Sequence, residues 1–284
     1  MAQLVSTEWL AGRLGLAGGG GDPGLVVLDA SYHLADTGRD AAAEYSAGHI
    51  PGARFVDFAT IAAASSGLDN TVPTAAQFGA RMGELGVGDE STVVLYDDSA
   101  LHSAARLWFL FRLFGKDVAV LDGGLAKWKA EGRPEQHEAP AWQPATFTPR
   151  EDKGLLRDKA DMLANVASRA EQVVDARGAA RFTGEGEEIR PGQPAGHIPG
   201  ARNLPIGMLY EADGTMKDAG GIEAEFVGAG LDLSRPVVTS CGSGVTAAVL
   251  SLALARIGKD SALYDGSWSE WAADPSTPKV TGPA

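Results

Sequence analysis

The chain has 284 residues, of which 44% are hydrophobic and 21% are charged, a composition typical of globular proteins and not of disordered ones. This length exceeds the usual size of one compact domain, so two domains are expected. The formal net charge of −13 argues against a nucleic-acid partner, because an acidic surface repels phosphate backbones.

The first residues, MAQLVSTEWLAGRLG, lack the basic start and apolar run of a secretory signal. No apolar stretch approaches the length that spans a bilayer. The single cysteine excludes an internal disulfide, makes a cysteine-rich metal site implausible and favours a reducing compartment. We therefore expect a cytoplasmic protein with no membrane partner, no metal and no organic cofactor.

Short apolar runs alternate with helical patterns along the chain. The expected elements are, in order, strands at 25–30 and 91–98, a helix at 103–115, strands at 117–123, 172–177 and 236–241, a helix at 246–258 and a strand at 260–266. Continuous β-branched runs suit strands that are buried on both faces, and their alternation with helices indicates a mainly parallel sheet. The predicted fold class is α/β.

The chain contains an internal repeat. The seven residues GHIPGAR occur at 48–54 and again at 196–202, and other matching pairs follow in the same order, so one fold is expected twice. We place the first copy at 1–135 and the second at 155–284. The stretch at 136–154 holds three prolines and no apolar period, which predicts an extended linker.

Each GHIPGAR segment is expected to form a turn that leads into a strand, with proline fixing φ and glycine supplying a conformation that other residues disfavour. Both copies keep the histidine, although only one copy has a cysteine. His49 and His197 are therefore interpreted as structural hydrogen-bonding residues and not as catalysts.

Cys241 follows an apolar strand directly, and GSGVTA leads from it into a helix. In a parallel sheet, ligands bind where strands pass into helices. Loop N–H groups and the helix dipole are expected to form an anion cradle there, built from Gly242, Gly244, Val245 and Thr246. Such a cradle favours the nucleophilic thiolate and can hold a persulfide anion. The alternative is a buried small hydrophobe, the commoner role of a free cysteine.

The duplication, both GHIPGAR segments, the DGG and DGS segments followed by tryptophan, and the CGSGVTA loop resemble tandem rhodanese-domain sulfurtransferases over nearly the whole chain. The loop is similar to that of the 3-mercaptopyruvate sulfurtransferase branch. The resemblance implies two rhodanese-like domains, each with a mainly parallel sheet flanked by helices. It also implies that the first domain is catalytically silent, because Asp97 stands at the place of the cysteine.

The resemblance further implies transfer of sulfane sulfur from 3-mercaptopyruvate, through a Cys241 persulfide, to a thiol, thioredoxin or cyanide, with release of pyruvate. Thiosulfate-preferring relatives carry basic residues after the cysteine, whereas this loop has neutral Gly242 and Ser243. The donor carboxylate needs a cation, preferably arginine. Arg181 and Arg190 resemble the two substrate-binding arginines of the family.

The sequence departs from the family pattern at one point. In mercaptopyruvate enzymes, a His and an Asp of the first domain have been proposed to work with the loop serine, here Ser243, to move protons. This chain has Ala59 and Asn70 where that Asp and that His are expected. His102 is then the candidate proton donor, with a capping or surface role as the alternative.

Two other functions also fit the Cys241 loop. They are thiosulfate:cyanide sulfurtransferase activity and a non-catalytic persulfide carrier. A phosphatase is disfavoured, because the arginine that completes a phosphate-binding cysteine loop is replaced by Ala247.

Overall fold

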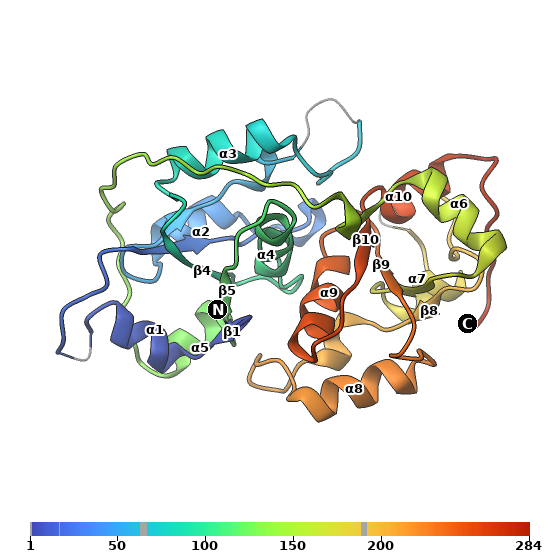
Figure 1. The fold of residues 1–284 in the computed structure, drawn as a ribbon. Coiled ribbons are helices and arrows are strands. Elements are labelled where there is room, and N and C mark those ends of the chain that lie inside the picture. The colour runs from blue at the N-terminus through green and yellow to red at the C-terminus, as the bar shows by residue number, and fades with distance from the viewer. Residues whose placement is uncertain (1, 17, 63–66, 189–191) are drawn as a thin grey trace. The chain divides into compact units, whose positions relative to one another are not determined.

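The computed structural model describes residues 2–16, 18–62, 67–188 and 192–284 (Figure 1). The chain divides into two compact units. The first unit consists of the described residues of Met1–Ala63, Val72–Asp152 and Glu211–Met216, and the second of those of Ala64–Thr71, Lys153–Tyr210 and Lys217–Ala284.

The first unit is built on five parallel strands in the order β1-β5-β4-β2-β3. The strands are β1 (Leu4–Val5), β2 (Leu25–Asp29), β3 (Arg54–Phe55), β4 (Thr92–Tyr96) and β5 (Ala119–Leu121). The helices are α1 (Thr7–Arg13), α2 (Ala41–Ala47), α3 (Ala75–Glu84), α4 (Ala104–Leu113) and α5 (Gly124–Ala130), with 3-10 turns η1 (Ala35–Thr37) and η2 (Phe58–Thr60).

The second unit repeats this plan in the order β6-β10-β9-β7-β8, again with parallel pairing. The strands are β6 (Leu156–Arg157), β7 (Gln172–Asp175), β8 (Arg202–Asn203), β9 (Val237–Ser240) and β10 (Ala262–Tyr264). The helices are α6 (Lys159–Ser168), α7 (Ala179–Thr183), α8 (Ala219–Gly228), α9 (Ala247–Arg256) and α10 (Ser267–Ala273), with 3-10 turns η3 (Lys153–Leu155) and η4 (Ile206–Leu209). Matching β6–β10 to β1–β5 gives the same strand order, which confirms the duplicated α/β fold.

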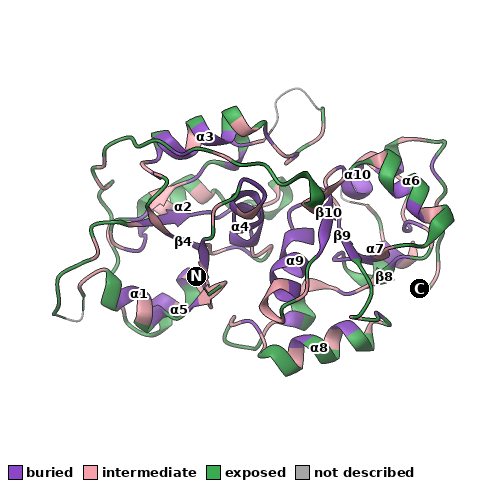
Figure 2. Ribbon diagram, in the orientation of Figure 1, coloured by how far each residue is buried: buried purple, intermediate pink, exposed green. Residues whose placement is uncertain are grey.

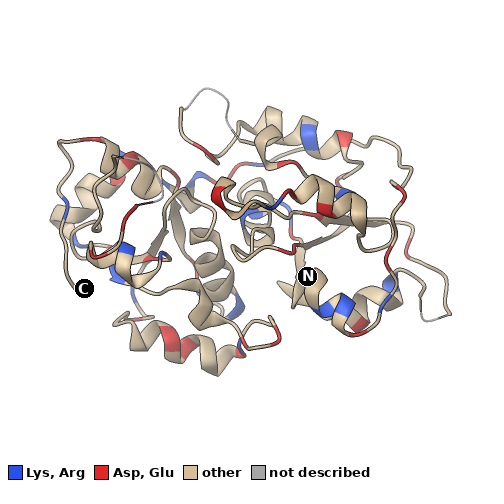
Figure 3. Ribbon diagram, turned by 180° about the vertical axis from the view of Figure 1, so that it is seen from behind, with Lys and Arg blue, Asp and Glu red and all other residues tan. Residues whose placement is uncertain are grey.

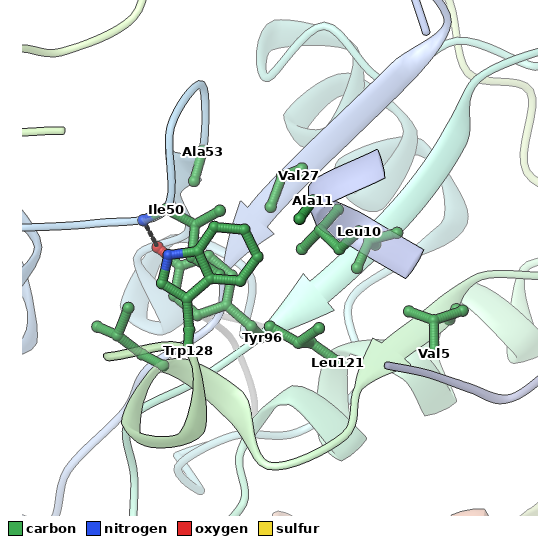
Figure 4. Close-up of a cluster of buried hydrophobic side chains, with 12 residues drawn as sticks. Val5, Leu10, Ala11, Val27, Ile50, Ala53, Tyr96, Leu121 and Trp128 are labelled. Carbon is green, nitrogen blue, oxygen red and sulfur yellow. Dashed lines mark hydrogen bonds between the residues drawn. The ribbon is translucent and has the colours of Figure 1, made fainter. Parts of the chain in front are cut away.

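One face of the first sheet packs against α1 and α5. Buried side chains of the cluster there are Val5, Leu10, Ala11, Val27, Ile50, Ala53, Val94, Tyr96, Ala119, Leu121, Leu125 and Trp128. In Figure 4 the Trp128 indole lies beside Ile50 and Tyr96, and the Ile50 N–H donates to the Tyr96 hydroxyl at 3.4 Å. The indole N–H of Trp128 donates to the Pro134 carbonyl at 2.8 Å, so burial of this large ring leaves its polar atom satisfied.

The helices that follow the two central strands are the most deeply buried. Figure 2 shows α4 and α9 buried along most of their length, whereas α3, α6 and α8 each expose one side. The exposed side of α8 carries acidic residues (Figure 3). Since α4 and α9 begin just after β4 and β9, the burial of these two helices fixes the loops that join each strand to its helix. Within the described residues, no helix has both the length and the apolar character to cross a membrane.

The two GHIPGAR histidines make the same contacts in their own units. His49 is buried, its Nδ1 lies 2.9 Å from the Tyr45 carbonyl, and its ring stacks on the Tyr45 ring. His197 is buried in the same way, with Nδ1 2.9 Å from the Phe182 carbonyl and its ring stacked on Phe182. These contacts match the structural role expected for both residues. Residues 137–152, all of them described, contain neither helix nor strand, while the exact linker boundaries stay a prediction.

Replacing Trp128 by alanine should lower the free energy of unfolding by about 3–5 kcal/mol, because it empties the centre of this cluster. Urea unfolding followed by circular dichroism measures the change. The control Leu16→Ala, at a side chain that is 43% exposed, should change stability by no more than about 0.5 kcal/mol. Equal effects of the two substitutions would contradict the packing described for Trp128.

Candidate active site

Three neighbouring strands of the second sheet end at one edge and bring their following residues together. β9 lies at the centre of the sheet between β10 and β7, and its last residue, Ser240, pairs with Asp175 at the end of β7. Cys241 comes directly after β9, and Ser267 is the third residue after β10. The carboxyl edge of a parallel sheet is the usual place for a ligand site.

The Cys241 side chain is almost wholly buried, with 1% of the residue exposed. Its sulfur accepts the N–H of Gly244 at 3.1 Å, in a turn where Gly244 has a φ of 85°. A left-handed φ favours glycine, which explains this residue in the loop. Gly242, Val245 and Thr246 complete the turn before α9, but among the described residues the N–H that reaches the sulfur is that of Gly244.

Ser267 is a second polar group at the sulfur. Its hydroxyl accepts the N–H of Cys241 at 3.3 Å, donates to the Tyr264 carbonyl at 3.0 Å and lies 3.9 Å from the sulfur. Ser267 holds a φ of 50°, which is costly for a residue with a Cβ. The matching residue of the first copy is Gly124, with a φ of 57°. In the sequence, this position is marked by the difference between DGS in the second copy and DGG in the first.

The start of α10 holds the backbone of the cysteine loop. The N–H of Trp268 donates to the Cys241 carbonyl at 2.9 Å, and the N–H of Ser269 donates to the Gly242 carbonyl at 2.9 Å. The Ser269 hydroxyl donates to the same Gly242 carbonyl. These bonds give both carbonyls a donor and tie the cysteine loop to the start of α10.

Arg181 lies against the cysteine loop, whereas Arg190 falls outside the described residues. A Cβ added at Gly242 would stand 3.2 Å from Arg181 Nη2, so a side chain at that position would crowd the guanidinium. Arg181 donates through Nε and Nη2 to Glu188 Oε2 at 3.1 and 2.6 Å, and its side chain stays 25% exposed. The structure thus brings one of the two expected arginines to the site.

A further arginine, Arg177, binds the same Glu188 carboxylate as Arg181, and the sequence patterns did not point to it. Its side chain is 1% exposed, binds Asp175 with Nε and Nη2, and donates from Nη1 to Glu188 Oε1 at 2.6 Å. Its guanidinium also stacks on Trp268, with 4.6 Å to the ring centroid. Burial lowers the pKa of Arg177, but the charges of Asp175, Glu188 and Cys241 outweigh it and the net shift is upward.

The comparisons with known proteins agree with this geometry. A family model of the rhodanese-like domain matches residues 22–131 and 158–274. The chain belongs to the tandem rhodanese-domain sulfurtransferases. It is 41% identical over 272 residues to the mouse (Mus musculus) 3-mercaptopyruvate sulfurtransferase, with 94% of this chain and 91% of the relative covered.

Relatives of this sulfurtransferase carry both donor names. It is 40% identical over 273 residues to the thiosulfate sulfurtransferase of Cricetulus griseus, with 94% and 91% of the two chains covered. Its fold matches the crystal structure of SseA from Escherichia coli, described as a 3-mercaptopyruvate sulfotransferase, with a TM-score of 0.84, 36% identity and 95% and 100% coverage. The chain is therefore a sulfurtransferase of the 3-mercaptopyruvate sulfurtransferase type.

In the first rhodanese domain, Asp97 takes the position after the central strand. Its carboxylate accepts the N–H of Ala104 at 2.7 Å and that of Ser99 at 3.2 Å. Burial raises the pKa of Asp97 from 3.8 to about 7, although these two hydrogen bonds lower it. The carboxyl group thus occupies the loop N–H groups that could otherwise hold an anion.

The residues considered for proton transfer, and the two that replace the expected Asp and His, lie in different parts of the chain. His102 lies in the loop after β4 with a φ of 49°, and burial lowers its pKa from 6.5 to about 4. Ala59 lies in η2 of the first unit, whereas Asn70 groups with the second. Ser243 is half-buried in the cysteine loop and forms no hydrogen bond with another described residue. The described residues contain no group of three or more His, Cys, Asp or Glu side chains suited to a metal.

Replacing Ser267 should separate activity from stability. Ser267→Gly and Ser267→Ala both remove the hydroxyl, so each should lower sulfur transfer about 10-fold. Ser267→Gly should be more stable than Ser267→Ala by about 1 kcal/mol, because glycine relieves the left-handed backbone. Turnover and urea unfolding of both variants measure this, and wild-type turnover in either variant would contradict a role for the hydroxyl.

Asp97→Asn should change how stability depends on pH. The folded-state pKa of about 7 lies above the ordinary 3.8, so the stability that protonated Asp97 contributes is fully present below pH 3.8 and is lost as pH rises through 7. The variant lacks this titration and should gain stability relative to the wild type between about pH 5 and about pH 8. Urea unfolding at both values tests it, and a difference that does not vary with pH would refute the upward shift.

Proposed function

We propose that the protein transfers sulfane sulfur from 3-mercaptopyruvate, through a persulfide on Cys241, to a thiol, thioredoxin or cyanide, and releases pyruvate. The observation that carries this proposal is the position of Cys241 after the central strand, with its sulfur accepting a loop N–H. Neutral Gly242 and Ser243 follow it, which suits a monoanionic donor better than the dianion thiosulfate.

The chemistry has two half-reactions. In the first, the Cys241 thiolate attacks the sulfur of mercaptopyruvate, a sulfur–sulfur bond forms, and the carbon–sulfur bond breaks. Its electron pair leaves on pyruvate as the enolate, which takes up a proton. In the second, an acceptor nucleophile attacks the outer sulfur and the Cys241 thiolate leaves. The Gly244 N–H donates to the Cys241 sulfur and the Ser267 hydroxyl lies 3.9 Å from it, so the loop offers polar groups that could hold the persulfide anion.

Arg181 and Arg190 are proposed to bind the carboxylate of the donor. Arg181 supports this role through its place beside Gly242 and its partly exposed guanidinium, which can offer two parallel donors to a carboxylate. Arg190 enters the proposal through the family resemblance alone.

His102 stays the candidate proton donor to the enolate. Because burial lowers its pKa to about 4, the imidazole is neutral at pH 7 and is a weak acid in that form. The protonated ring that can donate to the enolate is thus a minor form at neutral pH.

The second candidate function is thiosulfate:cyanide sulfurtransferase activity. The thiosulfate sulfurtransferase of Cricetulus griseus is 40% identical to this chain, close to the 41% of the mouse mercaptopyruvate enzyme, so overall identity does not separate the donors. A persulfide carrier without turnover would use the same Cys241 loop and is a third outcome of the experiment below.

Steady-state kinetics with each donor and cyanide tests these proposals. We expect a higher kcat/KM for mercaptopyruvate than for thiosulfate, and a loss of at least about 10³-fold in Cys241→Ser. Mass spectrometry after mercaptopyruvate alone should show one added sulfur atom on the peptide that contains Cys241. A preference for thiosulfate would favour the second candidate, a single loading without turnover would favour the carrier, and no added sulfur would exclude the mechanism.

A further inference from the structure

We infer that Glu188 is a positioning residue that aims Arg181 at the anionic end of the sulfur donor. The inference deepens the proposed function and rests on it. Its basis is a buried chain of charged groups that runs from the end of β7 to the cysteine loop.

Glu188 joins two arginines with its two carboxylate oxygens. Oε1 accepts from Arg177 Nη1 at 2.6 Å, while Oε2 accepts from Arg181 Nε and Nη2 at 3.1 and 2.6 Å. The Glu188 side chain is 2% exposed, whereas that of Arg181 is 25% exposed. One guanidinium is therefore fixed inside the protein and the other is held at its surface by the same carboxylate.

The inner end of this row of charged groups, at Asp175 and Arg177, is held by several contacts. Asp175, the last residue of β7, receives two nitrogens of the Arg177 guanidinium and the Arg177 backbone N–H. Arg177 also donates to the Gly196 carbonyl at 2.7 Å and stacks on Trp268, whose N–H binds the Cys241 carbonyl. Glu188 thus rests on a support that is tied to the same backbone as the cysteine.

The outer end is open for a ligand. Arg181 Nη1 forms no hydrogen bond with a described residue, so its N–H groups can bind an incoming anion. The side chain of Arg181 has several rotatable bonds, and holding it in one geometry without a partner costs entropy. Glu188 supplies this partner before the donor arrives, which lowers the cost of binding.

The charges of the group also matter. Asp175 and Glu188 carry two negative charges, and Arg177 and Arg181 carry two positive charges, so the four groups sum to zero at neutral pH. The group is therefore balanced before the donor arrives, and no surplus positive charge lies beside the cysteine loop in that state. Glu188→Gln would remove this balance and let Arg181 move.

The test compares Glu188→Gln with the matched control Glu187→Gln, whose side chain is exposed. We expect Glu188→Gln to lower kcat/KM for mercaptopyruvate roughly 10- to 100-fold, mainly by raising KM, because the Arg181 guanidinium is no longer held in one orientation. The control should behave as the wild type. Enzyme loaded with saturating mercaptopyruvate and then desalted should discharge its sulfur to cyanide at the wild-type rate in all three proteins, since cyanide does not need Arg181.

A double-mutant cycle separates positioning from general damage. Arg181→Ala should raise KM for mercaptopyruvate, and adding Glu188→Gln to it should cause no further rise. If Glu188→Gln does not fold, Glu188→Asp replaces it, because the shorter side chain keeps the charge but does not span both guanidiniums. A wild-type KM in the folded variant, or effects of the two substitutions that multiply, would overturn the inference.

Failure of the proposed function gives a different result. If mercaptopyruvate does not load the wild type, the proposed donor is wrong, and the same variants are measured with thiosulfate, whose negative charge also requires a cation. The positioning role is then tested by the KM for thiosulfate and by the same double-mutant cycle. A raised KM in Glu188→Gln with no further rise in the double variant supports it, and a wild-type KM overturns it.

Discussion

The turn between the central strand and its following helix needs a hydrogen-bond acceptor at its centre, and both domains meet this need differently. In the second domain the acceptor is the sulfur of Cys241, which takes the Gly244 N–H. In the first it is the carboxylate of Asp97, which takes two N–H groups. An unpaired buried N–H costs free energy, so each loop keeps an acceptor whether or not it does chemistry.

This constraint explains how the two copies keep one fold with different residues at the turn. The carboxylate of Asp97, with its two oxygens, fills the loop of the first domain at the position where the second domain has the sulfur of Cys241. The two copies also differ at the third residue of the DGG or DGS segment. Gly124 approaches the Asp97 carbonyl so closely that a Cβ would clash, whereas Ser267 adopts a left-handed backbone and its hydroxyl accepts the N–H of Cys241.

In the proposed function, the charged groups around the cysteine loop allow an acidic protein to bind an anion. The net charge of −13 describes the whole chain, but the site contains arginines whose charges are balanced locally by Asp175 and Glu188. Local pairing sets the field at the site because buried charges act over short distances with little screening. The overall charge therefore describes solubility and not the substrate.

The sequence by itself determined the α/β class, the duplication and the place of Cys241 between a strand and a helix. Apolar periodicity, a repeated segment and a strand–loop–helix order are local patterns, so they can be read without the tertiary structure. It also indicated Arg181, through the family resemblance. Only the tertiary structure decided that Ser267, Arg177 and Glu188 meet at the cysteine loop. Their meeting depends on β10 and β7 lying on either side of β9. Periodicity predicts which residues form strands, but the lateral order of parallel strands arises from packing across the sheet, which no local pattern encodes.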